Sequence, residues 1–465
     1  MIKLWLIDEE EKEAISNAFI SKSKDLKNFS IIQCPHDLIF FKNFKKIIEL
    51  DKNSSYGGLS PRITHIGFLY WISILPILLK EFHHFLIRKK WKKIYLSLGL
   101  DMFFYPKSIN FFTKIKYFYK ATLTFIALKS KKDILKHRFN GILCGDLIYD
   151  SYLRFNKKPT LNIFDFTLIL FIYECYFQIM YYEKLCKKHK IDKYYSTYST
   201  YIPHGIPVRV FLKNGIQVFT IAYSNNDELK IKQLSIDDTY QVSPHWNFRK
   251  IFNTLNNKEN LIENALYEFG KRFEGINDLT YMKSNQYSND YNSSKINIEN
   301  FDGVVFIGDF FDSQHIYRSI IFNDLYEWLI HTIELTKKNK LNIGFKTHPN
   351  QSLGSKIIID KIKSSFPTIQ WISSNVSNKI IFRSGIKFGV SVYGTVLPEL
   401  AFHNIIPICC GDNPASNYDF IFQAKNKKEY DDLINNYNTI QFPKNSKKQL
   451  GEFFHMNNIH FSNMR

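Results

Sequence analysis

Three short apolar runs between residues 341 and 410 are the feature that most constrains the fold. Leu341–Phe345, Ile386–Val392 and Ile405–Cys409 are rich in β-branched or aromatic residues and are bounded by turn-forming residues. Runs of this length and composition are typical of strands buried in a parallel sheet. The segments between them are long enough for crossover helices. The stretch therefore predicts βαβ units, which bind ligands at the carboxyl ends of their strands.

The N-terminal half of the chain shows the same alternation of apolar and helical segments. The runs Ile31–Cys34, Asn140–Cys144, Tyr194–Ser196 and Gln217–Ala222 are predicted as strands. A chain of 465 residues is too long for one ordinary core, so the pattern predicts two α/β domains.

A polar segment marks the expected domain boundary. Residues Met282–Glu299 are rich in Asn, Ser, Tyr and Asp, which is typical of a linker or a surface loop. The second half then opens with an apolar strand at Gly303–Gly308. The predicted organisation is an N-terminal domain 1–280, a polar linker 281–300, a C-terminal domain 301–440 and a tail 441–465.

Composition narrows the class of protein. The formal net charge of +19 implies an anionic partner such as nucleic acid, acidic lipid, or a charged saccharide or nucleotide. The positive charge is spread along the chain without a nucleic-acid-binding motif, so no nucleic acid partner is expected. Six scattered cysteines without a CxxC pair indicate reduced thiols in a cytoplasmic protein and no zinc site.

Two apolar stretches are long enough to compare with membrane spans. Ile63–Leu79 and Phe164–Tyr182 are both interrupted by polar residues, which are costly in lipid, so both are predicted as buried helices. The basic cluster Ile87–Lys93 follows the first stretch. It could be a solvated turn or could rest on an acidic membrane surface. The N-terminal run Met1–Asp8 is predicted as a strand, and the acidic residues after it exclude a secretory signal.

Two carboxylates follow the strand predicted at Asn140–Cys144. In the run Gly145–Arg154, Asp146, Asp150 and Arg154 are spaced four residues apart and share one face if the run is helical. A carboxylate here could act as a general base toward a hydroxyl nucleophile. Alternatively, Asp146 caps the helix and Asp150 pairs with Arg154.

A second polar run, Ser196–Arg209, follows the strand at Tyr194–Ser196. His204 and Arg209 could bind an acceptor sugar or an anionic group. A lone histidine in a turn also commonly has a structural role, and both interpretations stay open.

The first strand of the second half leads into the polar run Ile307–Tyr317. Gly308 permits close approach of a ligand, and His315 offers a polar contact toward an interdomain cleft. Asp312 or Ser313 could instead cap the helix that follows.

The run Lys346–Asn350 follows another predicted strand. Pro349 holds His348 out of helical geometry. His348 could then donate to a phosphate oxygen or act as an acid on a leaving nucleotide, with Lys346 adding positive charge.

The run Ser391–Leu400 offers a second phosphate site. Gly394 frees the backbone, so that Ser391, Thr395 and the amides of a helix N-terminus could hold phosphate. Glu399, one turn onward, could accept ribose hydroxyls. The sequence contains no GxxxxGK[ST] or GxGxxG motif, which argues against a P-loop kinase and a dinucleotide-dependent dehydrogenase.

Together these motifs resemble bacterial surface-carbohydrate (capsule and O-antigen) glycosyltransferases. The resemblance spans residues 140–435, and its motifs are Gly145–Arg154, Tyr201–Arg209, Phe311–Tyr317, Tyr326–Leu329, Lys346–Asn350, Val392–Val396 and Gly411–Pro414. It implies a GT-B fold, in which two Rossmann-like domains face each other across a cleft. The donor nucleotide would bind the C-terminal domain and the acceptor the N-terminal domain.

The His-Pro pair is also similar to the motif of bacterial sialyltransferases and Kdo transferases, which use CMP-activated acidic sugars. By this resemblance His348 contacts the donor phosphate, Ser391 and Thr395 bind phosphate, and Asp146 or Asp150 is the base. The sequence departs from that pattern because Ser-Val-Tyr-Gly-Thr replaces adjacent serines. Polyol-phosphate polymerases of the wall teichoic acid type have a related His-Pro pair. CMP-sugar, UDP-sugar and CDP-polyol donors therefore stay open, with CMP-sugar favoured over UDP-sugar.

The sequence thus predicts a metal-independent GT-B glycosyltransferase, because no Asp-x-Asp motif follows a predicted strand. It would need no cofactor, and it would transfer sugar from a nucleotide-sugar to a glycan or lipid-linked acceptor at the inner face of the cytoplasmic membrane. A sugar-nucleotide epimerase and a polyol-phosphate transferase of the teichoic acid type are the alternatives. The predicted donor-site residues are Gly308, His315, Lys346, Pro349, Ser391, Gly394, Thr395 and Glu399, and the predicted acceptor-site residues are Arg154, His204 and Arg209.

Overall fold

The computed structural model describes residues 6–18, 20, 28–61, 74–106, 111–222, 229–237, 242, 244–274, 287, 301–318 and 320–460. The chain forms two compact units. The first unit contains residues 1–156, 161–223 and 227–242, and the second contains residues 157–160, 224–226 and 243–465.

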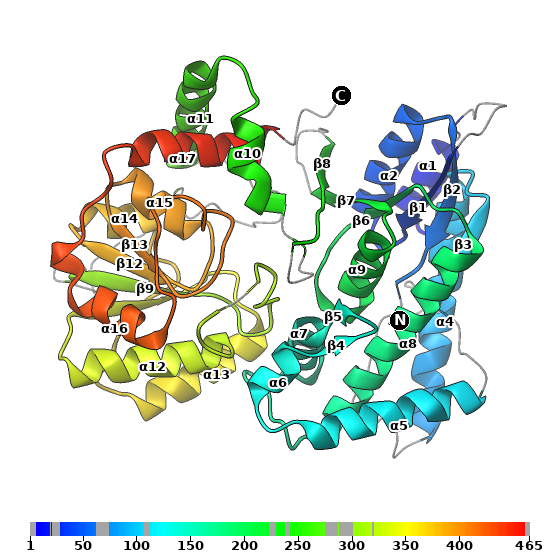
Figure 1. Ribbon diagram of the computed structural model, residues 1–465, viewed down its shortest axis with the longest axis horizontal. Coiled ribbons are helices and arrows are strands. Elements are labelled where there is room, and N and C mark those ends of the chain that lie inside the picture. Colours follow the sequence, from blue (N-terminus) through cyan, green and yellow to red (C-terminus); the bar gives the residue numbers. More distant parts are fainter. Residues whose placement is uncertain are drawn as a thin grey trace. The chain divides into compact units, whose positions relative to one another are not determined.

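The first unit is built on a six-stranded sheet (Figure 1). Its strands, in their order across the sheet, are β3 Met102–Phe104, β2 Ser54–Leu59, β1 Asn28–Gln33, β6 Lys193–Ser196, β7 Gln217–Ala222 and β8 Lys230–Gln233. All neighbours pair in parallel except β7 and β8. Ile31 and Tyr194 enter the core on one face, whereas Ile32 and Tyr195 enter it on the other, as the two-residue period of a strand requires.

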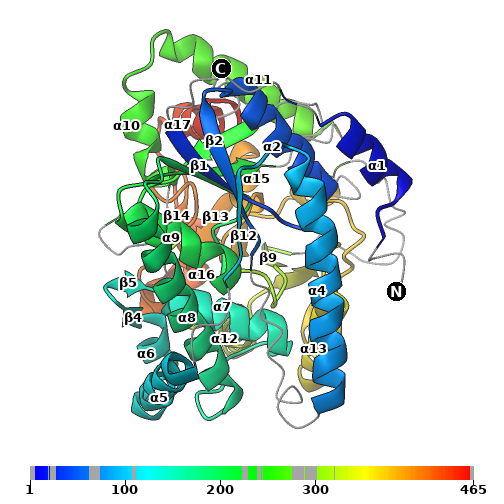
Figure 2. The same ribbon diagram turned by 90° about the vertical axis from the view of Figure 1, so that its right-hand side faces the viewer.

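Helices cover both faces of this sheet (Figure 2). They are α1 Glu9–Ser16, α2 Leu38–Leu50, α4 Ile74–Leu96, α5 Phe111–Ala127, α6 Lys131–Leu135, α7 Gly145–Asn156, α8 Thr167–Lys188 and α9 Ile206–Lys213, with a π-helix η2 at Tyr201–Gly205. Phe44 of α2 and Tyr95 of α4 pack on one face, while Phe171 of α8 and Phe211 of α9 pack on the other. Both faces must be covered because parallel strands are apolar on both sides.

The second unit is built on a six-stranded sheet that is parallel throughout. Its strands, in their order across the sheet, are β11 Gln370–Ile372, β10 Ile343–Thr347, β9 Gly303–Ile307, β12 Phe388–Ser391, β13 Ile406–Cys409 and β14 Phe422–Gln423. Both sheets therefore have the chain order 3-2-1-4-5-6, which is the order of Rossmann domains. The predicted α/β fold class with two Rossmann-like domains is confirmed.

Helices also cover both faces of the second sheet. They are α10 Phe248–Phe252, α11 Lys258–Arg272, α12 Leu325–Lys338, α13 Leu353–Ser365, α14 Asn378–Arg383, α15 Val396–Phe402, α16 Lys427–Asn435 and α17 Ser446–Phe454, with short turns at η3 Pro244–Asn247, η5 Tyr437–Thr439 and η6 His455–Ile459. α12, α13 and α16 pack on one face and α14 and α15 on the other. Short polar residues start several of these helices, since Asp324, Ser352 and Asn426 each accept a backbone N–H of the first turn.

The chain divides earlier than predicted. α10 and α11 fall within the predicted N-terminal domain 1–280, yet they belong to the second unit. The reason is an apolar cluster in which Phe252 and Phe269 pack with Phe454 of α17. The same cluster corrects the predicted tail 441–465, because α17 and η6 are packed helical elements.

Some predicted elements fall outside the described residues. These are the linker 281–300 except for Tyr287, most of the strand Met1–Asp8, and residues 63–73 of the first apolar stretch. The second apolar stretch forms much of α8, as predicted, and its Glu174 is buried and accepts a hydrogen bond from Gln178. Among the helices that the structure describes, none is long and apolar enough to cross a membrane.

The basic cluster Ile87–Lys93 does not form a turn. It continues α4, and Lys90 lies within the first unit, where its ammonium group is 2.6 Å from Glu11. Trp91 is buried and its ring stacks on His36. The aromatic anchor expected for a membrane surface at this segment is therefore part of the core.

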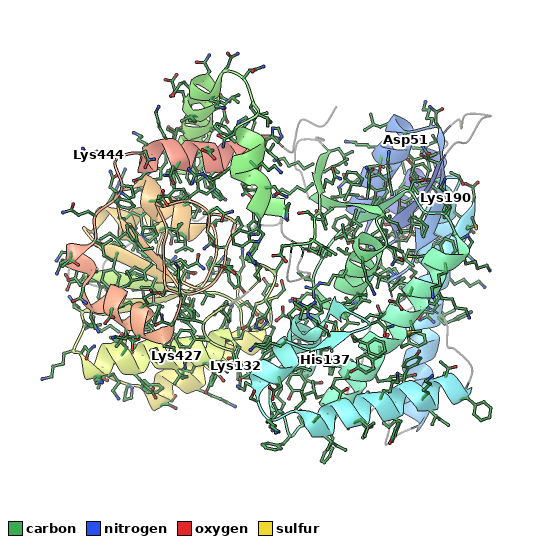
Figure 3. All side chains as sticks on the ribbon, viewed as in Figure 1. Asp51, Lys132, His137, Lys190, Lys427 and Lys444 are labelled. Carbon is green, nitrogen blue, oxygen red and sulfur yellow. The ribbon has the colours of Figure 1, made fainter. Side chains whose placement is uncertain are left out.

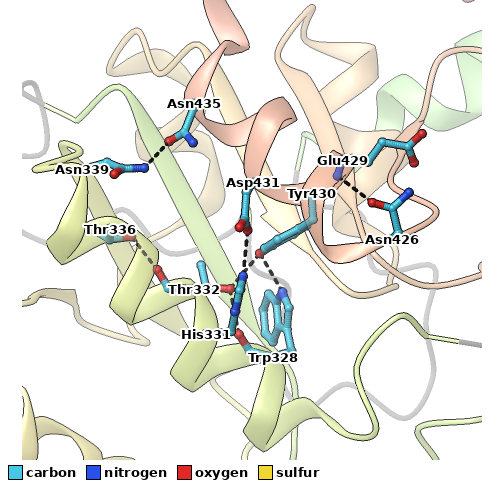
Figure 4. A network of polar contacts seen from close by, with 10 residues as sticks. All are labelled: Trp328, His331, Thr332, Thr336, Asn339, Asn426, Glu429, Tyr430, Asp431 and Asn435. Carbon is cyan, nitrogen blue, oxygen red and sulfur yellow. Dashed lines mark hydrogen bonds and ion pairs between the residues drawn. The ribbon is translucent and has the colours of Figure 1, made fainter.

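A closed chain of hydrogen bonds joins α12 to α16 in the second unit (Figure 4). Trp328 Nε1 donates to the hydroxyl of Tyr430 at 2.8 Å. Thr332 Oγ1 lies 2.8 Å from that hydroxyl and donates to the Trp328 carbonyl. Because the Thr332 proton is directed to the carbonyl, the Tyr430 hydroxyl donates to Thr332. All three side chains are buried, so each needs the partner that this arrangement supplies.

Replacing Tyr430 with phenylalanine leaves the buried Trp328 N–H without its acceptor. An unsatisfied buried donor costs about 1–3 kcal/mol, so Tyr430→Phe should lower the free energy of unfolding of the second unit by that amount. Denaturant titration followed by tryptophan fluorescence measures the change. The control Asn435→Ala breaks the exposed Asn339–Asn435 bond and should change stability by less than about 0.5 kcal/mol. Equal effects of the two substitutions would contradict this account.

Candidate functional site

The candidate site lies at the carboxyl edge of the second sheet, where β9 pairs with β10 on one side and β12 on the other. The helices that follow β9 and β12 cover opposite faces of the sheet. In doubly wound sheets, ligands bind at such a switch point. Gly308 and Asp309 follow β9, His348 follows β10, and Val392–Thr395 follow β12. The strand order therefore brings motifs that are distant in the sequence to one edge.

His348 is held by its backbone and by one ring nitrogen. Its amide donates to the carbonyl of Ile307 at the end of β9, and its Nδ1 accepts the amide of Asn350, each at 3.1 Å. An accepting Nδ1 places the proton of a neutral ring on Nε2. Burial lowers the pKa of His348, the charge of Lys346 lowers it further, and Asp309 opposes both. At neutral pH the ring is therefore a neutral donor rather than an imidazolium acid.

Lys346 is buried on β10 with 2% of its surface exposed. Its ammonium group donates to Asn378 Oδ1 at 2.7 Å. Burial lowers the pKa of Lys346 to about 8, although the charge of Glu399 raises it. The side chain is therefore a cation at neutral pH, held in a region of low dielectric where its charge acts strongly.

Asp309 was missed by sequence reasoning, although it directly follows a predicted strand. Burial raises the pKa of Asp309, but hydrogen bonds from the amides of Ser352 and Phe311 outweigh this and lower it. Asp309 is therefore a carboxylate at neutral pH. Its charge reaches His348, and it fixes the start of α13 beside the end of β9.

In the second predicted phosphate motif, Ser391–Leu400, some side chains already have hydrogen-bond partners within the protein. Ser391 is buried, and its hydroxyl is bonded to the carbonyls of Phe306 and Tyr393, so its single proton is committed to the protein. A phosphate bound by Ser391 would have to replace one of these contacts, and that role stays a prediction. Gly394 and Thr395 are exposed immediately before α15, and Gly394 has a φ of +134°, which favours glycine. These two residues stay candidates.

Glu399 belongs to a buried network that contains an ion pair. Its Oε1 is 3.1 Å from the guanidinium of Arg272, and its Oε2 accepts the hydroxyl of Tyr287 at 2.5 Å. All three side chains are buried. Both carboxylate oxygens thus have partners within the protein, and the role of Glu399 as a ribose ligand stays a prediction. Neither partner carried a sequence signal, because both lie far from the motif in the chain.

The other donor-side residues have structural partners. The carbonyl of Gly308 accepts from Gln351, and His315 is buried with Nε2 3.0 Å from the carbonyl of Asn323. Pro349 lies in the turn between β10 and α13. The helix expected to start at Asp312 or Ser313 is instead capped by Asp324.

In the first unit, Asp146 and Arg209 form a buried bidentate ion pair. The guanidinium nitrogens lie 2.6 and 2.5 Å from the two carboxylate oxygens, and the same guanidinium donates to the carbonyl of Leu143. The strand before Asp146, β5 Ile142–Leu143, pairs antiparallel with β4 Arg138–Phe139 and lies outside the six-stranded sheet. In this structure each side chain is paired with the other, and the roles of Asp146 as a base and Arg209 as an acceptor ligand stay predictions.

The remaining residues of this motif lie on α7. The first residue of the helix, Gly145, has to be glycine, because a Cβ at this position would collide with the carbonyl of Ile134 of α6. Asp150 is buried. Arg154 is exposed, with its guanidinium 5.6 Å from the centre of the Tyr201 ring. The roles of Asp150 as base and Arg154 as acceptor ligand stay predictions.

His204 lies near the switch point of the first sheet, in η2 after β6. It is partly buried, burial lowers its pKa to about 4, and the ring of Tyr198 meets it edge-on at 5.4 Å. Gln33 ends the adjacent strand β1, and its Oε1 accepts from the amide and hydroxyl of Thr197. Among the described residues, His204 Nδ1 and Gln33 Nε2 have no hydrogen-bond partner. Sequence reasoning missed Gln33, whose position at a strand end was its only signal.

No grouping of three or more His, Cys, Asp or Glu side chains suited to a metal ion occurs in the described part of the chain. No protein-family model and no curated protein matches the sequence.

Three solved structures are similar to the chain over nearly its whole length. The UDP-GlcNAc 2-epimerase of Methanocaldococcus jannaschii, in complex with UDP-GlcNAc and UDP, is 10% identical, with 92% of this chain and 98% of that chain covered and a TM-score of 0.30. MnaA of S. aureus with UDP is 10% identical, with 94% and 93% covered and a TM-score of 0.27. The UDP-GlcNAc 2-epimerase of Neisseria meningitidis bound to UDP-GlcNAc is 7% identical, with 92% and 97% covered and a TM-score of 0.25.

Replacing Asp146 with asparagine leaves the Arg209 guanidinium buried without its counter-charge. Removal of one partner of a buried ion pair costs about 3–5 kcal/mol, so Asp146→Asn should destabilise the first unit by that amount in thermal unfolding. The double variant Asp146→Leu with Arg209→Met, which leaves no buried charge, should recover most of the loss. An Asp146→Asn protein of unchanged stability that lacked activity would restore Asp146 as the base.

Proposed function

We propose that the chain is an enzyme that acts on a nucleotide-activated sugar, with the nucleotide bound at the carboxyl ends of β9, β10 and β12. One observation carries the proposal. The strand order brings Lys346 and His348 to the same sheet edge as Gly394 and Thr395. This is the edge at which Rossmann-like domains bind nucleotides.

The chemistry of this edge suits a departing nucleotide. Cleavage of the bond between a sugar and its nucleotide leaves negative charge on a phosphate oxygen. The buried cation of Lys346 and the Nε2–H of neutral His348 would stabilise that charge, because both are held in place before the reaction. Thr395 and the amide of Gly394 would add donors. No divalent metal is required in this scheme.

Glycosyl transfer to a glycan or lipid-linked acceptor is the first candidate reaction. It requires a base that accepts the proton of the acceptor hydroxyl. Because Asp146 is committed to Arg209, Asp150 is the carboxylate left for this role among those predicted. The His-Pro resemblance makes a CMP-activated acidic sugar the first donor to test.

Epimerisation of a nucleotide-sugar is the second candidate. It would use the same nucleotide site and needs no acceptor. The buried Asp146–Arg209 pair favours it, because that pair removes the carboxylate first predicted to activate an acceptor. The two reactions differ in a simple readout. Transfer releases nucleotide only when an acceptor is present, whereas epimerisation changes the sugar without one.

A thermal-shift screen with CMP, UDP, GDP and CDP tests the proposal. At least one nucleotide should raise the unfolding temperature, and the sugar-nucleotide of that base should then be converted, with or without a glycan acceptor, as followed by NMR. A CDP response would instead favour transfer of a polyol phosphate. No shift with any of the four nucleotides would refute the proposed function.

His348→Asn should weaken binding of the responding nucleotide by about 10- to 100-fold, because a hydrogen bond to a charged group contributes about 1.5–3 kcal/mol. Calorimetric titration measures the affinity. The control His331→Asn removes a histidine of the same unit that pairs with Asp431 at 2.7 Å, and it should leave the affinity unchanged. Equal affinities of His348→Asn and the wild type would remove His348 from the site.

Nucleotide affinity should fall as pH rises through about 8, because Lys346 loses its charge there. The depressed pKa has the opposite effect on stability. The folded chain releases this proton near pH 8 and the unfolded chain near its ordinary value of about 10.4, so stability from this group rises between those values. Loss of the Lys346 charge therefore does not itself destabilise the folded chain. In Lys346→Met the affinity should be low and independent of pH, and a wild-type affinity that stays constant from pH 7 to 9 would exclude a role for this charge.

A further inference from the structure

α5 is apolar on both sides, although only one side meets the core of the first unit. Tyr117 and Ala121 are buried against the core that contains α8. The opposite face carries Phe112, Ile115, Tyr119, Leu123 and Ile126, which are 80%, 51%, 62%, 48% and 70% exposed. Their spacing of three or four residues places them in one stripe along the helix. An exposed apolar stripe of this length commonly marks an interaction surface.

The loop before α8 extends this stripe. Phe164 and Phe166 are both largely exposed, and the ring of Phe166 is 5.7 Å from that of Phe125 on α5. Helix and loop therefore form one surface. We call this surface the α5 patch and define it by the five residues of the stripe together with Phe164 and Phe166.

Lysines flank the α5 patch along the helix, and the acid within its loop, Asp165, accepts hydrogen bonds from Tyr152 and Thr167. Residues 111–132 contain six lysines and no acidic residue. Lys116 and Lys120 are exposed on α5, and Lys132, labelled in Figure 3, lies just beyond it on α6. The nearest acid along the chain is Asp133. Its carboxylate accepts hydrogen bonds from the backbone amides of Lys129 and Ser130, so it stabilises the turn at the start of α6.

We propose that the α5 patch docks this protein on an anionic lipid bilayer, with α5 lying parallel to the membrane surface. Exposed aromatic and aliphatic side chains beside lysines match the interface of such a bilayer, where apolar groups enter the acyl boundary and ammonium groups meet the headgroups. Lysine stems are long enough to reach back to headgroups while the stripe is buried.

Charge favours lipid over a second copy of the chain. A two-fold pairing of the α5 patch would bring the same lysines of both copies toward one another, since such an interface uses identical surfaces. An anionic bilayer instead offers the opposite charge. The site is also distinct from Ile87–Lys93, whose Lys90 and Trp91 are used inside the unit.

Vesicle flotation tests the proposal with the full chain. Wild-type protein should float with phosphatidylcholine–phosphatidylglycerol vesicles and should bind pure phosphatidylcholine vesicles more weakly. High salt should weaken the anionic component. The triple variant Ile115→Asn, Leu123→Asn, Ile126→Asn should lower the bound fraction by about tenfold or more, because it removes apolar side chains that would enter the bilayer.

A matched control replaces exposed apolar residues of α13, with Leu353→Asn and Ile357→Asn, and should bind vesicles as the wild type does. Lys116→Glu with Lys120→Glu should reduce binding to anionic vesicles alone. Unchanged flotation of the triple variant would overturn the proposal. The proposal would also be overturned if the wild-type protein did not bind vesicles but formed a dimer that the triple variant does not form. The assay involves no nucleotide, so its outcome is separate from that of the proposed enzyme activity.

Discussion

The pairing of β9 with β10 on one side and β12 on the other is the constraint on which the candidate site depends. The register sets Thr347 level with Ile307 and Val390 level with Val305, so the three strands end at one edge. The strands are parallel and buried on both faces, so their polar loops can gather only beyond the carboxyl ends. The amide of His348, bonded to the carbonyl of Ile307, extends this pairing one residue past the sheet. The histidine is thus positioned by the backbone before any ligand arrives.

Buried charged side chains on β10 and on the neighbouring helices stabilise this edge of the sheet. Lys346 on β10 is joined to Asn378 on α14, and the charge of Glu399 on α15 acts on the same lysine. Glu399 is in turn paired with Arg272 of α11. Each buried charge is costly alone, so each element is held to the next by the need for a partner. Such a network keeps the lysine charged and fixed, which is the condition under which a buried cation stabilises a developing negative charge.

Most of the fold could be predicted from local sequence patterns. The features that sequence reasoning missed depend on contacts between residues that are distant in the chain. β9, β10, β12 and β13 follow from apolar runs whose composition dictates buried strands. The partners of polar residues could not be read in the same way. No local sequence signal predicts that Asp146 pairs with Arg209 on another helix, or that Glu399 pairs with Arg272. The two-domain split was expected, but its position depends on how Phe269 packs with Phe454, which no local pattern encodes.

Local sequence patterns also do not show which face of a helix is exposed at the protein surface. α5 has apolar residues on two faces, and only the packed structure separates its covered face from its exposed one. The sequence left two interpretations of the basic cluster of α4 open, a solvated turn or a membrane face, and neither predicted that Lys90 and Trp91 make contacts inside the unit. If the acceptor is lipid-linked, binding of the exposed face of α5 to the bilayer would bring the protein to its substrate. An enzyme resting on the bilayer meets such a substrate by diffusion in two dimensions, and lysines beside the apolar stripe would keep it there without a spanning helix.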